Sequence, residues 1–164
     1  MRVVDLERLY DYGYWANARL FDMLAGVTPD GFTRCVAGGH ASVRNTLVHI
    51  LSAEWGWLER CGGLRRGERL RPELYPTPDS VRATWTHVEG HMRGLLAGLT
   101  DAALERRIAF SFGAPERSAR LGDLLRHAGL HAIHHRGQSA MLRRLLGHGP
   151  GSFDFLEYAA SEPA

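Results

Sequence analysis

The sequence lacks lysine altogether, so arginine supplies every fully charged basic side chain. The 20 arginines are spread along the chain among 18 acidic residues, which leaves a formal net charge of +2. A charge this small does not indicate a nucleic-acid partner. The densest basic stretch, RRGERLRPE at 65–73, includes two glutamates, and we interpret it as a solvated loop.

Cysteine and long apolar runs are also scarce. Cys35 and Cys61 are too few for a disulfide framework, and neither has the spacing of a zinc-binding pair, so both are expected to be reduced. The chain has no run of about 18 apolar residues, which argues against a membrane helix. The first residues, MRVVDLERLYDYGYW, mix charge and hydrophobicity too finely for a signal-peptide core. We therefore expect a cytoplasmic protein with no membrane partner.

Four long segments with helical periodicity fill most of the chain. The first ends before the turn-forming stretch GVTPDG (26–31), the second opens with Ser42 as N-cap, and the third opens with Thr77 as N-cap and Pro78 at the first helical position. The segments run from about Asp5 to Leu24, from Ser42 to Cys61, from Thr77 to about Leu99, and from about Gly122 to Leu146. This pattern predicts an all-α fold, a four-helix bundle formed by a single domain over residues 1–164.

Two excursions interrupt the helices. After Gly62 and Gly63, an arginine- and proline-rich stretch predicts a long crossover loop. In residues 105–121, Ile108, Phe110 and Phe112 alternate with polar residues, and turn residues follow at 113–116. That alternation predicts a small hairpin before the last long helix. A short terminal helix is predicted near residues 154–160.

The last long segment contains HAIHHRGQ at 131–138, and it gathers histidines on one helical face. At about 100° per residue, five side chains project from one side of the helix: His127, His131, His134, His135 and Gln138. Leu124 and Leu142 lie on the same stripe, one before and one after the cluster. A stripe with leucine at both ends is expected to face the interior of the bundle.

Buried imidazoles need partners, and a divalent metal ion is the favoured interpretation. His131 and His135 are four residues apart, a spacing at which two rings can bind one ion. His49 is the best third ligand, because its neighbours are apolar. The His87–His91 pair has small and polar neighbours and is expected at the surface, while His40 and His148 are expected to be exposed in glycine-rich loops. A hydrogen-bonded histidine cluster and metal-free acid–base catalysis remain as alternatives.

Several stretches together resemble the DinB/YfiT-like family of metal-binding four-helix bundles. They are YGYWANARLFDML (12–24), SVRNTLVHILSAEWGWL (42–58), HAIHHRGQ with SAMLRRLLG after it, and FDFLEYAA (153–160). The resemblance implies His49, His131 and His135 as the metal ligands. It makes His127, His134 and Gln138 candidates for orienting a ligand or lining the pocket.

The resemblance also implies a function. Some members are metal-dependent S-transferases or isomerases that use low-molecular-weight thiols, so we expect a three-histidine metal to activate a thiol against a small electrophile. Zinc, nickel, iron and manganese all suit such a site. A homodimer is implied as well. The arginines of the 65–71 loop, or Arg136, are candidates for binding an acidic cosubstrate.

Two rival functions stay open. One is a metal-dependent hydrolase, in which hydroxide on the metal is the nucleophile. Its carboxylate base is hard to find, because Glu54 lies about 140° around the helix from His49. The other is a bundle that binds metal or ligand without catalysis.

Overall fold

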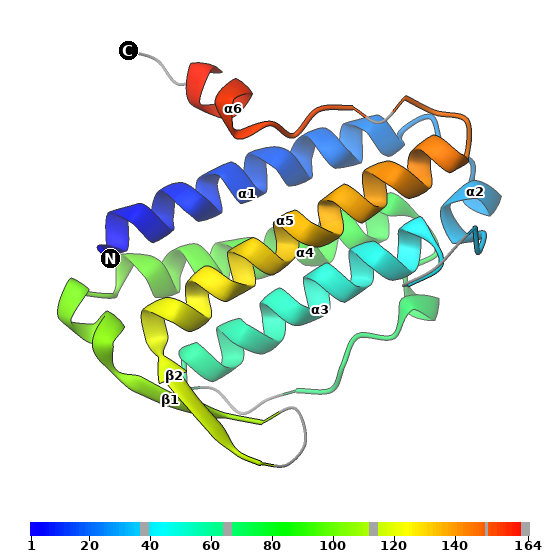
Figure 1. Ribbon diagram of the computed structural model, residues 1–164. Coiled ribbons are helices and arrows are strands. Elements are labelled where there is room, and N and C mark those ends of the chain that lie inside the picture. Colours follow the sequence, from blue (N-terminus) through cyan, green and yellow to red (C-terminus); the bar gives the residue numbers. More distant parts are fainter. Residues whose placement is uncertain (37–39, 64–66, 112–114, 150, 162–164) are drawn as a thin grey trace.

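The computed structural model describes residues 1–36, 40–63, 67–111, 115–149 and 151–161 (Figure 1). These residues are mostly helical, with one small two-stranded sheet. The α-helices are α1 (Val3–Leu24), α2 (Pro29–Thr33), α3 (Val43–Cys61), α4 (Pro78–Ala97), α5 (Leu121–Leu145) and α6 (Phe155–Ser161). Two short 3-10 helices cover Pro72–Leu74 and Asp101–Glu105. The four long helices and the terminal one lie within a few residues of their predicted positions.

Side-chain hydroxyls cap the first turns of α3 and α4. The Ser42 hydroxyl accepts a hydrogen bond from the Asn45 amide at 3.1 Å, and the Thr77 hydroxyl accepts one from the Ser80 amide at 3.2 Å. Each satisfies an amide that the helix itself leaves unpaired. The one-turn helix α2 was not predicted. It begins inside GVTPDG because Thr28 caps the Gly31 amide at 3.0 Å and Pro29 supplies a helical φ.

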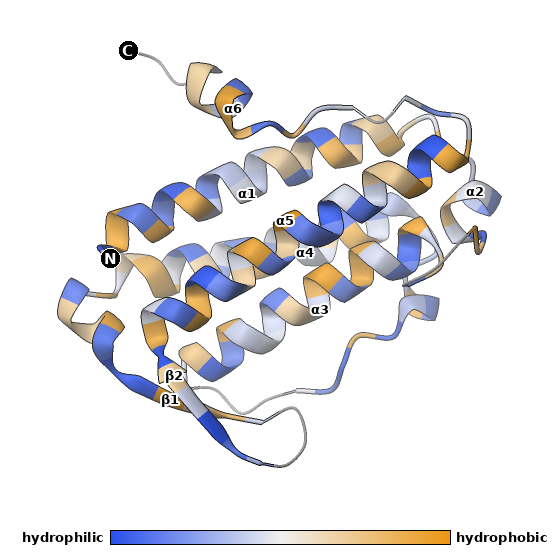
Figure 2. Ribbon diagram, viewed as in Figure 1, coloured by the Kyte–Doolittle hydropathy of each residue, from blue (hydrophilic) through white to orange (hydrophobic). Residues whose placement is uncertain are grey.

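The four long helices run side by side (Figure 1), with α5 packing against α1 and α3, and α4 packing against the same two helices. Their facing sides are apolar. Fully buried side chains come from all four, including Leu6, Leu20, Leu47, Leu51, Met92 and Leu125. A hydrophilic band crosses the middle of α5 (Figure 2), where the histidines of HAIHHRGQ lie.

The predicted hairpin is confirmed. Strands β1 (Arg107–Phe110) and β2 (Arg117–Arg120) pair antiparallel, with Phe110 opposite Arg117. Phe112 and the first turn residues lie outside the described residues. Phe110 contacts the indole of Trp57, with 5.7 Å between the ring centroids, so the hairpin supports a side chain that lines the candidate site.

The connection between α3 and α4 lies along α3. The Gly67 amide donates to the Glu59 carboxylate at 3.0 Å, and the Leu70 amide donates to the Ser52 hydroxyl at 3.4 Å. These two bonds hold the two residues between them, Glu68 and Arg69, close to α3. The crossover loop predicted from the sequence therefore contributes to the site.

The terminal helix α6 packs on the outer side of α1 (Figure 1). Tyr158 contacts Tyr12 and Trp15, with ring centroids 5.7 Å and 5.8 Å apart. Within the described residues, no helix is both long and apolar enough to cross a membrane.

Candidate metal centre

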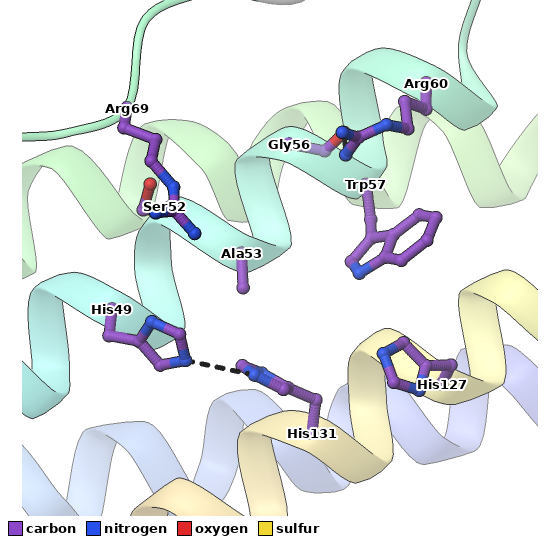
Figure 3. A pocket seen from close by; sticks show the side chains of 9 residues that line it. All are labelled: His49, Ser52, Ala53, Gly56, Trp57, Arg60, Arg69, His127 and His131. Atoms are coloured by element: carbon purple, nitrogen blue, oxygen red, sulfur yellow. Dashed lines mark hydrogen bonds between the residues drawn. The ribbon is translucent and has the colours of Figure 1, made fainter. Parts of the chain in front are cut away.

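Three histidines from two helices converge on one point. The Nε2 atom of His49, on α3, lies 3.1 Å from that of His131 and 3.1 Å from that of His135, both on α5. The Nε2 atoms of His131 and His135 are also 3.1 Å apart. The three nitrogens thus form an equilateral triangle between α3 and α5. Figure 3 shows one side of it, the contact between His49 and His131.

Hydrogen bonding alone does not satisfy this triangle. A neutral imidazole carries either a proton or a lone pair at Nε2, so at least two of three neutral rings share the same state. At least one contact therefore sets two lone pairs or two N–H groups against each other at 3.1 Å. A cation bound by three lone pairs removes the conflict. Two nitrogens that are each about 2.0–2.1 Å from one ion lie about 3 Å apart at bond angles near 90–100°, which fits the triangle.

Two of the three rings, those of His49 and His131, are held in the state that metal binding requires. The pKa of His49 and that of His131 are each lowered to about 4, first by burial and then by the neighbouring histidines. Burial disfavours the charged imidazolium, and a second imidazolium nearby disfavours it further. Both rings are therefore neutral at pH 7, and each keeps a lone pair for a ligand.

A glutamine orients one of the three rings. The side-chain oxygen of Gln138 lies 2.7 Å from Nδ1 of His135, and its amide nitrogen lies 3.1 Å from Nε2 of His134. Because the oxygen only accepts, Nδ1 of His135 must donate, and the lone pair of the neutral ring is then at Nε2. The candidate residues Gln138 and His134 are thus joined to His135 in one chain of hydrogen bonds.

His40 was expected to be exposed, and this prediction is wrong. Its side chain is half-buried, and its ring stacks on that of His49 with centroids 3.8 Å apart and planes 25° apart. Ring nitrogens of His40, His49 and His135 all lie within 4.8 Å of one another, so these three form a second possible ligand set. We favour the set with His131, because stacking brings His40 to His49 through its face, whereas His131 approaches through Nε2.

The prediction that the histidine-rich face of α5 is turned to the interior is confirmed only in part. Leu124 and Leu142 are buried, and His131 and His135 are half-buried. His127 and His134 are exposed, because they lie on the side of α5 that turns toward solvent. His127 still lines a cavity beside the triangle, and its ring contacts Trp57 with centroids 5.5 Å apart.

The second HxxxH pair is at the surface, as predicted. His87 and His91 are both exposed on α4, and their Nε2 atoms lie 3.1 Å apart. Within the described chain, no third histidine completes this pair as His49 completes the first. The molecule therefore contains a two-histidine counterpart of its three-histidine centre.

Two cavities adjoin the triangle. One, of about 190 Å³, lies between α3 and α5 (Figure 3) and is lined by His49, Ser52, Ala53, Gly56, Trp57, Arg60, Arg69, His127 and His131. The other, of about 440 Å³, is lined by His40, Ala41, Asn45, Val48, His49, Ser52, Arg69, Leu70 and Pro72. Both are bordered by His49, Ser52 and Arg69, so the two cavities adjoin each other beside the triangle.

Sequence reasoning missed Arg60 and Trp57 as lining residues. Helical periodicity carries the signal for the first, since Arg60 is eleven residues after His49 and so lies about 20° from it around α3. The position of Trp57 depends on the hairpin that packs against it, which periodicity does not describe.

Arg136 does not face the site, and its candidacy for binding a cosubstrate is overturned. It is 2% exposed, and its Nη1 donates to the carbonyl of Gly13 at 3.3 Å and to the side chain of Asn17 at 2.9 Å. Its Nε has no hydrogen-bond partner among the described residues. Arg136 joins α5 to α1, on the side of α5 away from the histidines.

Glu54 also lies away from the histidines. It is buried, and its two carboxylate oxygens accept hydrogen bonds from the Tyr14 hydroxyl at 2.6 Å and the Trp85 indole at 2.9 Å. Burial raises its pKa, although these two hydrogen bonds act in the opposite direction. Among the residues described here, no carboxylate lines either cavity beside the triangle.

Comparison with known proteins connects this geometry to a family. The model of the DinB family matches residues 1–164. A crystal structure of a DinB-like protein from Bacillus cereus is similar, with a TM-score of 0.74 and 22% identity, over 92% of this chain and 97% of that chain. A DinB-like protein from Bacillus subtilis gives a TM-score of 0.63 and 17% identity, over 92% and 95%. A comparison with curated proteins finds no match.

Proposed function

The chain belongs to the DinB family, and from this we propose that it is a metal-dependent enzyme that transfers a low-molecular-weight thiol to a small electrophile or uses such a thiol in an isomerisation. The observation that carries the proposal is the triangle of Nε2 atoms, each 3.1 Å from the other two. His49, His131 and His135 are the proposed ligands of zinc, nickel, iron or manganese. The geometry does not favour one of these metals over the others.

The chemistry of the bound cation is simple. A divalent ion stabilises negative charge on an atom that it binds, which lowers the pKa of a thiol. The protein's own residues do the rest. Gln138 fixes the ring of His135, and His40 restricts the ring of His49 by stacking on it. The two cavities that meet at His49 give each of two reactants its own place.

A transferase fits these surroundings better than a hydrolase does. A hydrolase of this kind usually has a carboxylate near the metal that takes a proton from water. Glu54 is buried and bound by Tyr14 and Trp85, so it is not available for that role. An external thiol needs only a cation and an open cavity.

The test compares thiol consumption with and without protein. Metal-loaded protein should conjugate monochlorobimane with bacillithiol, mycothiol or glutathione faster than the thiol reacts alone, and His131→Ala should abolish the acceleration. The variant His87→Ala/His91→Ala is the matched control, because it removes the exposed pair and keeps the triangle. If the wild-type protein holds metal but accelerates none of the three reactions, the transferase is contradicted, and the hydrolase and the non-catalytic binding bundle remain.

Three further features belong to the same proposal. We propose that residues 1–164 form one four-helix bundle domain, that the protein is cytoplasmic, and that it is a homodimer. Unpaired Cys35 and Cys61 suit a reducing compartment. Leu130, Met141 and Leu145 are each more than half exposed and lie within about 60° of one another around α5, which supports a dimer contact there. Light scattering should give a dimer mass, and Met141→Glu should reduce it to the monomer.

A further inference from the structure

We propose that the 190 Å³ cavity binds a small carboxylate, which Arg60 and Arg69 hold against the face of Trp57. This inference deepens the proposed function by naming the chemical class of one reactant, and it rests on that function only for the reactant's role. Both arginines line the cavity, one from α3 and one from the connection that lies over it (Figure 3).

Arg60 is held in place by its neighbours. Its Nη1 donates to the carbonyl of Gly56 at 3.2 Å, and its guanidinium carbon lies 5.2 Å from the centroid of the Trp57 ring. A guanidinium that rests on an aromatic face loses little further freedom when a ligand binds. A guanidinium beside a cavity offers the geometry that pairs with both oxygens of a carboxylate.

Arg69 supplies the second charge. Hydrogen bonds from Gly67 and Leu70 to side chains of α3 fix the chain on either side of it. Its side chain borders both cavities beside His49 and lies near Ser52 (Figure 3). Within the described parts of the chain, no carboxylate lies within ion-pair distance of Arg69. A substrate carboxylate would give this guanidinium a counter-ion.

The cavity also limits the size and shape of the ligand. Its volume is about 190 Å³, below the roughly 300–1,000 Å³ of pockets that take drug-sized ligands. Trp57 forms an apolar wall and contacts Phe110 and His127, at ring-centroid distances of 5.7 Å and 5.5 Å. These walls favour a small ligand with a planar apolar body and an acidic end.

The experiment uses metal-free protein, so that no metal contributes to carboxylate binding. Calorimetric titration compares benzoate with benzamide, which has the same shape without the charge, and with succinate and inorganic phosphate. Benzoate should bind at least tenfold more tightly than benzamide. Arg60→Met and Arg69→Met should each weaken benzoate binding about tenfold, and Arg60→Lys should retain part of it. Arg71→Met is the control, because exposed Arg71 lines neither cavity.

Several outcomes would overturn the inference: equal affinity for benzoate and benzamide, unchanged binding in both methionine variants, or no saturable binding of benzoate or succinate. Tighter binding of phosphate than of either carboxylate would contradict the assigned class. Circular dichroism of each variant separates lost binding from lost fold. A negative thiol assay does not affect the interpretation of this titration, because the titration requires neither metal nor turnover.

Discussion

The side-chain oxygen of Gln138 accepts a hydrogen bond from Nδ1 of His135 at 2.7 Å, and this single contact decides which nitrogen of the ring carries the proton. A neutral imidazole with its proton at Nδ1 has its lone pair at Nε2. The glutamine thus directs the lone pair of His135 toward His49 and His131. Partners of this kind commonly contribute tenfold to a hundredfold in metal affinity.

Gln138→Leu should therefore weaken metal binding by about 10–100-fold, because the His135 ring loses the acceptor that fixes its tautomer. Gln138→Glu should keep most of the affinity, since a carboxylate also accepts from Nδ1. Competition with a chromophoric chelator measures both. Equal metal affinity of wild type and Gln138→Leu would contradict a role for Gln138 in metal binding.

Removal of any one of His49, His131 and His135 should lower the bound metal from about one ion per chain to a small fraction. Two imidazoles hold an ion much less firmly than three. The His87→Ala/His91→Ala variant should keep wild-type metal content, although its two rings have the same 3.1 Å separation. Elemental analysis after desalting gives the answer. Metal retained in all three single variants would contradict the proposed ligand set.

Added metal should also raise the melting temperature of the wild-type protein. An ion present at a hundred times its dissociation constant stabilises the folded state by about 2.7 kcal/mol if it binds only that state. Calorimetry of metal-free and metal-loaded samples should show the shift in wild type and lose it in His131→Ala. A similar shift in both proteins would assign the stabilisation to another site.

Tyr14→Phe should destabilise the fold by about 1.5–3 kcal/mol, because a buried carboxylate loses a hydrogen bond from the tyrosine hydroxyl. The same change should raise the pKa of Glu54 further, since the bond from Tyr14 lowers it. Denaturant unfolding measures the first effect. Tyr12→Phe is a useful comparison, because its hydroxyl donates to the carbonyl of Phe153 and lies in a separate cluster.

Glu54 should also give the fold a distinct pH dependence. Its pKa is raised in the folded protein by burial, so above about pH 4 the unfolded chain loses this proton more readily than the folded chain. Its contribution to stability is therefore greatest below the unfolded pKa and decreases as pH rises toward the folded pKa. As pH rises from the unfolded pKa to the folded pKa, the unfolding free energy of wild type should decrease relative to that of Glu54→Gln. A pH-independent difference would contradict the raised pKa.

The sequence predicted the parts of the site that depend on local geometry. His131 and His135 are one helical turn apart, so their meeting follows from the period of α5 alone. The same period places Arg136 about 140° around α5 from His131, which predicts that Arg136 lies away from the site. Its proposal as a residue that binds an acidic cosubstrate did not take this angle into account. His40 was misjudged because its place over His49 depends on how a loop folds back onto α3. Burial among apolar neighbours identified His49 correctly as a residue that meets the other two.

Helix α3 carries His49 on one side and Glu54 on another, and this joins the triangle to the interior. Hydrogen bonds from Tyr14 on α1 and Trp85 on α4 restrain Glu54 on two sides. They therefore restrict rotation of α3 about its own axis. A rotation of α3 by about 10° would move the end of a side chain on its surface by about 1 Å. That displacement is enough to disrupt the spacing of the three Nε2 atoms. The angular setting of His49 is thus fixed from the far side of the helix that carries it.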